Sequence, residues 1–381
     1  MDRAFALADA QRSRLTHREQ WIVVVAVALY AAVVIVIRRH YGGDIVPEIQ
    51  LSQRWIDGLP LYRPALSSQG TPWPPFAAMA LAPLGLLARV SLPGAVAVWS
   101  AISVACLAIA VVLARRWGGW RTAVLAFVAT AVPIQTNFEH RNVNTILLVL
   151  VVAAAVDLED ARERRAGLWL GLAAAIKAFP ALLIPYLAMQ RRWRAFGVAT
   201  AVAAGGTLLA LAPYGAGGLS NAADWLQSSL TPERWQLSVN DQSLRALVLR
   251  MGGTPTLALG LAVLCAAGVL VSAGTRTWDA LSGLGAVLLA SVLATPIAWT
   301  HYYALAFPGW AAVIRNSPSH FGRVRGTALI FAAVATSGFL TVGPRSLRHA
   351  LLAGSVYAWG SLVLLVVLEW SGRHQAKLGS A

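Results

Sequence analysis

Long apolar stretches restrict what this chain can fold into more than any other feature of its sequence. The stretch Leu92–Leu113 carries no Asp, Glu, Lys or Arg. At about 1.5 Å per residue, a helix of that length crosses a hydrocarbon core of about 30 Å. Hydrophobic residues make up 57% of the 381 residues and charged residues only 12%, and the mean hydropathy is +0.62. This composition excludes an ordinary soluble domain and predicts an all-α, polytopic bundle of transmembrane helices.

The net charge of +15 raises the question of a nucleic-acid partner. The Lys and Arg residues, however, form short clusters between the apolar stretches rather than a face or a tail, which is typical of topology signals and contacts with anionic lipid. We therefore expect the lipid bilayer, and no nucleic acid, as a partner. Cys106 and Cys265 both lie inside apolar stretches, so we expect neither a disulfide nor a thiol metal site.

The order of apolar stretches and basic clusters predicts about twelve membrane segments with both chain ends in the cytoplasm. Residues 1–20 would form a basic tail, 21–369 one multi-span domain, and 370–381 a second tail. The first span, Trp21–Ile37, is expected to be a retained anchor. The apolar piece Pro75–Leu87 is short for a crossing, and counting it as one would place a basic cluster outside. It is therefore expected to lie in the outer interface.

Polar residues concentrate in three loops that this topology places outside the cell membrane, and these loops cover residues 38–91, 135–144 and 213–253. Asp44 follows the end of the first span by seven residues, so it is expected near the membrane–water boundary. Partial desolvation there suits a general base. A transporter would instead place polar residues at mid-membrane, on broken helices in two matching halves. The pattern favours a catalytic outer face.

Several further stretches carry a family resemblance. Besides Asp44, they are WPPFAAMALAPL, NVNTILLVL, GLWLGLAAAIKAFPALLIPYL with the following RRWR, NDQSL and TPIAWTHYY. In their order and spacing, the chain resembles glycosyltransferase family 87, a GT-C family that uses polyprenyl-phosphate sugars. The chain departs from the family pattern at His140 and Arg141, at Tyr302, and after Asp44, where Ile45 follows and the usual nearby Tyr is missing.

The resemblance implies one inverting displacement at the outer membrane face. An acceptor hydroxyl attacks the anomeric carbon of a sugar carried on a polyprenyl monophosphate, and the lipid phosphate leaves. The transferred group would be hexosyl, by default mannosyl, and the acceptor a glycolipid or a polysaccharide. A carrier monophosphate leaves without a metal, and the external loops show neither a DxD pair nor ligands at metal-binding spacing, so we expect no metal and no cofactor.

Each candidate site residue has a structural alternative. Asp44 is either the base or a solvated loop acid, and Glu48, one helical turn later, is a substitute base if Pro47 lies in a first turn. Lys177 lies between two apolar stretches too short to cross, at the apex of a hairpin. It either binds the donor phosphate or extends its amine to the interface. His301 either holds the phosphate or lies in an aromatic interface belt.

The remaining candidates would contact the sugar or the phosphate from the other loops. His140 and Arg141 would bind the donor, although Arg141 is equally explained by an ion pair with Glu139. The acceptor or sugar hydroxyls would be bound by Glu48, Asn240, Asp241 and Gln242, of which the last three would otherwise form an ordinary turn.

Other functions stay open at this point. A flippase or transporter of lipid-linked substrates would have the same spans but would need no base. A membrane scaffold would leave Asp44 replaceable. An arabinosyl or other pentosyl transferase of the same superfamily would differ only in its sugar.

Overall fold

The computed structural model describes residues 43–62, 73–230, 238–276, 278–316 and 323–378, together with a few single positions between 16 and 33. Most of the predicted N-terminal tail and of the first span lies outside these residues, whereas 370–378 of the predicted C-terminal tail is described and belongs to a helix. Parts of three predicted loops, 63–72, 231–237 and 317–322, also lie outside the described residues.

Within the described residues the fold is entirely helical, as predicted, and its only β feature is one isolated bridge between Asp241 and Trp299. The first elements are α3 (Ile45–Ile56), α4 (Pro75–Ala80), α5 (Ala82–Val90), α6 (Leu92–Ala114), η2 (Arg115–Trp117), α7 (Gly119–Val128), α8 (Ala131–His140), α9 (Asn144–Glu159) and α10 (Glu163–Ile176). The middle of the chain forms η3 (Phe179–Leu182), α11 (Leu183–Met189), α12 (Trp193–Leu211), η4 (Ala212–Tyr214), α13 (Gly217–Leu230), α14 (Leu244–Arg250) and α15 (Pro255–Thr275). The last elements are α16 (Ala280–Ala294), η6 (Thr300–Ala306), α17 (Phe307–Arg315), α18 (Arg323–Ser337), η7 (Phe339–Val342), α19 (Arg345–Ala353) and α20 (Val356–Leu378).

Three described helices are long and apolar enough to cross a membrane: Leu92–Trp117, Trp193–Tyr214 and Pro255–Thr275. A fourth candidate is the pair α19 and α20, which is bent by 54°. The predicted count of about twelve segments is not confirmed. The reason is visible in the helices, because several apolar stretches are divided into pieces too short to cross alone. The stretch Arg121–Ile134, for example, is split between α7 and α8.

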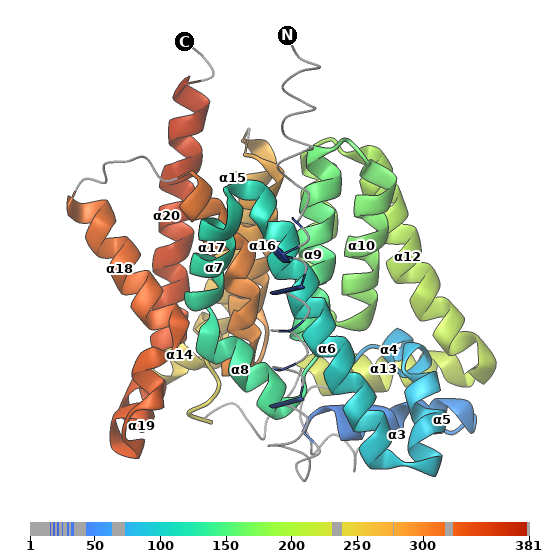
Figure 1. The fold of residues 1–381 in the computed structure, drawn as a ribbon. Coiled ribbons are helices and arrows are strands. Elements are labelled where there is room, and N and C mark those ends of the chain that lie inside the picture. Colours follow the sequence, from blue (N-terminus) through green and yellow to red (C-terminus); the bar gives the residue numbers. More distant parts are fainter. Residues whose placement is uncertain are drawn as a thin grey trace.

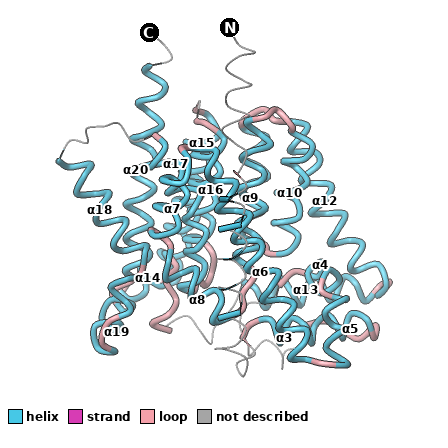
Figure 2. Tube along the Cα trace, viewed as in Figure 1, coloured by secondary structure: helices cyan, strands magenta, loops and turns pink. Residues whose placement is uncertain are grey.

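The segment Pro75–Leu87 forms two short helices, α4 and α5, that meet at Leu81. Both pack against α3, and Gln53 Nε2 of α3 donates to the carbonyl oxygen of Gly85 at 3.2 Å. Figures 1 and 2 show α3, α4, α5 and α13 gathered at one end of the longer helices. The predicted helical character of this segment is confirmed, and its position at the membrane interface stays a prediction.

The centre of the bundle is α16, whose residues Leu281–Leu293 are all buried. A helix that is apolar on every side is stable only when other helices surround it, and α16 contacts α9, α15, α17 and α20. Around this core, α12 and α15 keep large apolar side chains exposed, such as Leu208 and Leu264, each 68% exposed. Surfaces of this kind suit contact with lipid.

Small residues set the close approach of α10 and α12. A Cβ on Gly167 would lie 2.4 Å from the carbonyl oxygen of Ala195, and one on Gly171 would lie 2.7 Å from that of Ala199. Glycine spaced by four residues lets two helices in a membrane pack backbone to backbone. This contact fixes the position of α10, whose last residue immediately precedes Lys177.

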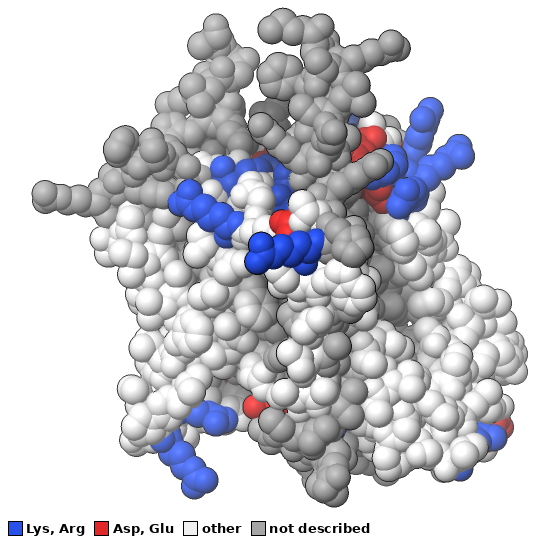
Figure 3. All heavy atoms as spheres, viewed as in Figure 1, with Lys and Arg blue, Asp and Glu red and all other residues white. Residues whose placement is uncertain are grey.

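Charged residues lie mainly at the two ends of the molecule. In Figure 3, blue and red spheres gather toward the top and bottom of the visible face, and the described residues between them are white. At the end formed by the α9–α10 turn, Arg162 pairs with Asp157 at 2.7 Å and Arg315 with Glu159 at 3.0 Å. The α8 C-terminus, α3 and α19 lie at the opposite end (Figure 1).

Candidate active site

A cavity of about 640 Å³ opens at the end of the molecule that holds α3, α8 and α19. The polar stretches around Asp44, His140, Lys177, Asn240 and His301 all contribute to it. Its other polar lining residues are Glu48, Gln135, Thr136, Glu139, Asn142, Ser238, Thr300, Thr341, Arg345 and Arg348.

The backbone before α3 holds Asp44 at the cavity wall. Gly43 has φ +64°, and a Cβ there would lie 2.4 Å from the carbonyl oxygen of His140. This close approach lets the Asp44 backbone N–H donate to the same oxygen at 2.7 Å. Only glycine combines that backbone angle with that contact at little cost. Asp44 is the N-cap of α3, yet its side chain makes no capping bond and is left for other contacts.

The Asp44 carboxylate is held on one side and open on the other. Its Oδ2 accepts a hydrogen bond of 2.8 Å from Asn142 Nδ2 and lies 3.7 Å from His301 Nε2. The Asp44 side chain is 39% exposed, which leaves room for a substrate hydroxyl. Asn142 is a site residue that sequence analysis missed, although it lies in the quoted NVN segment.

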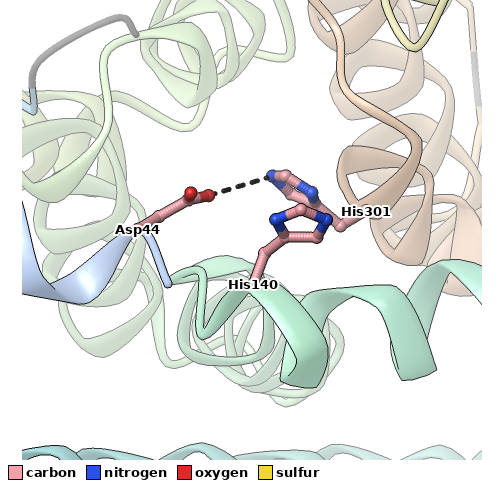
Figure 4. Close-up of side chains that lie close together, drawn as sticks. All are labelled: Asp44, His140 and His301. Carbon is pink, nitrogen blue, oxygen red and sulfur yellow. Dashed lines mark ion pairs between the residues drawn. The ribbon is translucent and has the colours of Figure 1, made fainter. Parts of the chain in front are cut away.

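Asp44, His140 and His301 form an Asp–His–His cluster, drawn in Figure 4. One ligand atom from each lies within 4.8 Å of the others, and the centroids of the two imidazole rings are 5.2 Å apart. Such donors can hold a divalent cation such as Zn²⁺. The sequence alone predicts no cluster of this kind, because its members are far apart in the chain and meet only in the folded protein.

His301 is the buried member of the cluster and is 3% exposed. Burial, with His140 and Lys177 nearby, lowers the pKa of His301 well below its usual value. Its imidazole is therefore neutral near pH 7, so it can exchange hydrogen bonds with a ligand but supplies no fixed positive charge. Its Nε2 has no hydrogen-bond partner among the described residues. Asn144 Nδ2 donates to the His301 carbonyl oxygen at 3.1 Å and fixes the backbone there.

Lys177 supplies positive charge at the wall of the cavity. It stands in extended conformation between α10 and η3, which confirms the predicted break, and it is 6% exposed. Its Nζ lies 5.5 Å from the centre of the Trp73 ring and 5.6 Å from that of Tyr302. Two aromatic faces of this kind stabilise an ammonium group away from bulk water.

Glu48 lies near Lys177 on the first turns of α3, with Pro47 in the first turn as the prediction required. Its Oε1 accepts a long hydrogen bond of 3.4 Å from the Trp73 backbone N–H. Burial raises the pKa of Glu48 to about 8, and the attraction of Lys177 opposes that rise only in part. Glu48 is therefore mostly protonated at neutral pH, which makes it a poor base there.

A second cavity, of about 290 Å³, adjoins the first at Lys177 and Tyr302, which line both. Its walls come from η3, α13, α15 and α16 and are mainly apolar. They include Phe179, Leu182, Trp225, Leu226, Leu230, Ala266 and Pro296.

Three predicted site residues do not line the larger cavity. Asp241 is buried and accepts from the backbone N–H groups of Ser243 at 2.9 Å and Ala298 at 3.0 Å. Gln242 donates to the Leu352 carbonyl oxygen at 2.8 Å. These bonds hold the loop that carries Asn240, which does line the cavity. Arg141 is buried, and its carbonyl oxygen accepts from Trp99 Nε1 at 2.9 Å.

Arg345 and Arg348 are cavity residues that sequence analysis missed. A signal existed in the sequence, because Arg345 and Arg348 form a short basic cluster between two apolar stretches.

Comparison with known proteins shows to which family this chain belongs. A polyprenol-phosphate-mannose-dependent alpha-(1-2)-phosphatidylinositol mannoside mannosyltransferase of Mycolicibacterium smegmatis is 28% identical over 378 residues, covering 86% of this chain and 83% of the relative. A polyprenol-phosphate-mannose-dependent alpha-(1-2)-phosphatidylinositol pentamannoside mannosyltransferase of the same organism is 29% identical over 250 residues, covering 62% of this chain and 59% of the relative. A protein of that second description from Mycobacterium tuberculosis is 28% identical and covers 62% and 56%, respectively. No solved structure matches. The family model described as Glycosyltransferase family 87 matches residues 72–298, more than half of the chain, and the protein therefore belongs to glycosyltransferase family 87.

Proposed function

We propose that this protein transfers a hexosyl group, mannosyl by its relatives, from a polyprenyl-phosphate sugar to a hydroxyl of a glycolipid or polysaccharide acceptor on the outer face of the cell membrane. The observation that carries the proposal is the pairing of two cavities at Lys177. One is polar and holds a positioned carboxylate, and the other is apolar. A polyprenyl-phosphate sugar has a polar sugar on one side of its charged phosphate and a hydrocarbon chain on the other, so its two parts match the two cavities.

The donor would lie across this junction. The first isoprene units of its polyprenyl chain occupy the apolar cavity, its phosphate contacts Lys177, and its sugar enters the polar cavity. Lys177 is suited to the phosphate because it is largely shielded from water, where a charge contact is stronger than at the surface. A positive charge fixed at the leaving phosphate stabilises the transition state as negative charge develops on the bridging oxygen.

The acceptor hydroxyl would approach Asp44 from the open side of the carboxylate. As the hydroxyl oxygen bonds to the anomeric carbon, its proton passes to Asp44, and the bond from the anomeric carbon to the phosphate oxygen breaks. Polyprenyl phosphate leaves with the bonding electron pair, and one displacement inverts the anomeric configuration. The hydrogen bond from Asn142 keeps the Asp44 carboxylate in place. Glu48 is mostly protonated at neutral pH and therefore cannot accept the proton of the hydroxyl.

The experiment is transfer in proteoliposomes with radiolabelled polyprenyl-phosphate mannose, glucose and arabinose, and a phosphatidylinositol mannoside as acceptor. We expect mannose transfer, and a product whose new linkage is inverted relative to the donor. The apolar cavity is tested with Ala266→Phe, which should lower the use of a polyprenyl donor more than that of an analogue with a methyl group in place of the chain. The matched control is Ala267→Phe, since Ala267 is exposed on the same helix and does not line the cavity. Transfer from none of the three donors would overturn the proposed function.

The side of the membrane is tested by cysteine labelling in a chain whose Cys106 and Cys265 are replaced by Ala. Asn240→Cys lies at the cavity and Ala161→Cys at the α9–α10 turn, and both positions are exposed. An impermeant maleimide should label the first in intact cells and the second only after permeabilisation. The reverse pattern would place the cavity in the cytoplasm and refute an outer active site.

A further inference from the structure

Helix α19 carries two arginines at the edge of the polar cavity that the proposed reaction does not use. Arg345 and Arg348 are three residues apart, so they lie on the same side of the helix. Both are exposed, and both line the cavity together with Val342, Gly343 and Leu352. Figure 3 shows blue spheres at the lower left of the molecule, where α19 lies.

In the described part of the chain, no hydrogen bond or ion pair is formed by Arg345 or Arg348. Three acids line the same cavity. The Asp44 carboxylate accepts from Asn142, Glu48 lies near Lys177, and Glu139 forms no ion pair with either arginine. Arg89, an exposed arginine of α5, does have an acidic partner, Asp57. The α19 edge of the cavity thus carries two positive charges without an ion-pair partner among the described residues.

The position of these arginines separates them from the donor phosphate. Lys177 adjoins the apolar cavity, whereas neither arginine lines that cavity. In Figure 1, α3 and α19 lie on opposite sides of α8. A donor that occupies Lys177 and the apolar cavity leaves the α19 edge open for the other substrate.

We propose that Arg345 and Arg348 bind a phosphodiester of the acceptor, so that the preferred acceptor is an anionic lipid glycoside. This inference rests on the proposed function. Two guanidinium groups present planar pairs of N–H donors, which match the oxygens of a phosphodiester better than an ammonium group does. The contact would orient the acceptor so that a sugar hydroxyl reaches Asp44 while the lipid part stays at the membrane surface.

The test compares two acceptors that share a terminal mannose, a phosphatidylinositol mannoside and the uncharged octyl α-mannoside. The double variant R345Q/R348Q should raise the KM for the charged acceptor about tenfold or more, the scale of a lost charge-assisted contact. The KM for octyl mannoside and for the donor should stay within twofold, and R345K/R348K should recover part of the lost affinity. The deacylated form of the charged acceptor separates the phosphodiester from its lipid: the variant should weaken its use as well. The matched control is R89Q, which removes an exposed arginine at the same end of the molecule but outside the cavity.

The possible outcomes test the two arginines and the proposed function separately. If the wild type turns over normally and R345Q/R348Q has an unchanged KM for the charged acceptor, the assignment of the two arginines is wrong and the proposed function stands. A raised KM for the donor instead of the acceptor overturns that assignment too, because the arginines would then contact the donor phosphate. An equal loss with both acceptors points to misfolding or misplacement of α19 and likewise counts against a phosphodiester contact. A wild type that transfers no sugar from any polyprenyl-phosphate donor removes the proposed function itself.

Discussion

Replacing Asp44 by Asn separates chemistry from folding at this site. The amide has the size of the carboxylate and can still accept the 2.8 Å hydrogen bond from Asn142 through its own oxygen. The backbone bond of 2.7 Å to the His140 carbonyl oxygen does not involve the side chain and should persist. Because the side chain makes no helix-capping bond, α3 should form normally. The variant therefore loses the proton acceptor and little else.

A lost general base lowers the rate by about 10²–10⁴-fold, which corresponds to about 3 to 5 kcal/mol in the barrier. The assay is single-turnover transfer in proteoliposomes with saturating donor and acceptor, so that binding does not mask the chemical step. Donor affinity, measured by competition with a photoreactive polyprenyl-phosphate analogue, should stay within threefold of the wild type.

The matched control is Asp57→Asn, which alters the exposed acid at the other end of α3 and should be active. Glu48→Gln should also retain most of its activity, since Glu48 is largely protonated in the wild type at neutral pH. A rate for Asp44→Asn within threefold of the wild type would refute Asp44 as the base. Equal losses in Asp44→Asn and Asp57→Asn would refute the claim that the effect is local to the cavity.

Three other predictions concern the surroundings of the base. Gly43→Ala should lower the transfer rate about tenfold or more, because the new Cβ would force Asp44 away from His140. The control Gly58→Ala, at a similar φ of +65° with open space around it, should keep the wild-type rate. Equal transfer rates in the two variants would contradict the role of Gly43 in positioning Asp44. Above about pH 8 the neutral Glu48 becomes a carboxylate that repels the donor phosphate and pairs with Lys177. The KM for the donor should therefore rise with pH through that value in the wild type and stay constant in Glu48→Gln. A rise of equal size in the wild type and in Glu48→Gln would show that another group titrates. Treatment with EDTA should leave transfer within about twofold, because a base must keep its lone pair free; a loss that Zn²⁺ or Mn²⁺ restores would show that the Asp–His–His cluster holds a metal.

Much of the architecture could be predicted from local sequence properties. Apolar stretches without charges predicted helices, and the described residues are helical with a single isolated β-bridge. The lone lysine between two short apolar stretches predicted the break at Lys177, because an ammonium group cannot remain inside a continuous lipid-facing helix without a partner. Pro47 was compatible with a first helical turn and lies in one. Asp44 was chosen for its place beside a span and is found at a cavity wall.

Two features could be seen only in the tertiary structure: how many helices are long enough to cross a membrane, and which residues line the site. Asp241 and Asn240 are neighbours with similar local sequence, yet one is buried in backbone hydrogen bonds and the other lines the cavity. Asp44 and the two histidines meet because Gly43 packs onto the α8 C-terminus and because η6 turns back toward it. Which segments are helical and apolar can be predicted from the amino-acid sequence, since these properties follow from side chains within a few residues of one another. Which polar groups face a common space cannot, because it depends on contacts and angles between helices far apart in the chain.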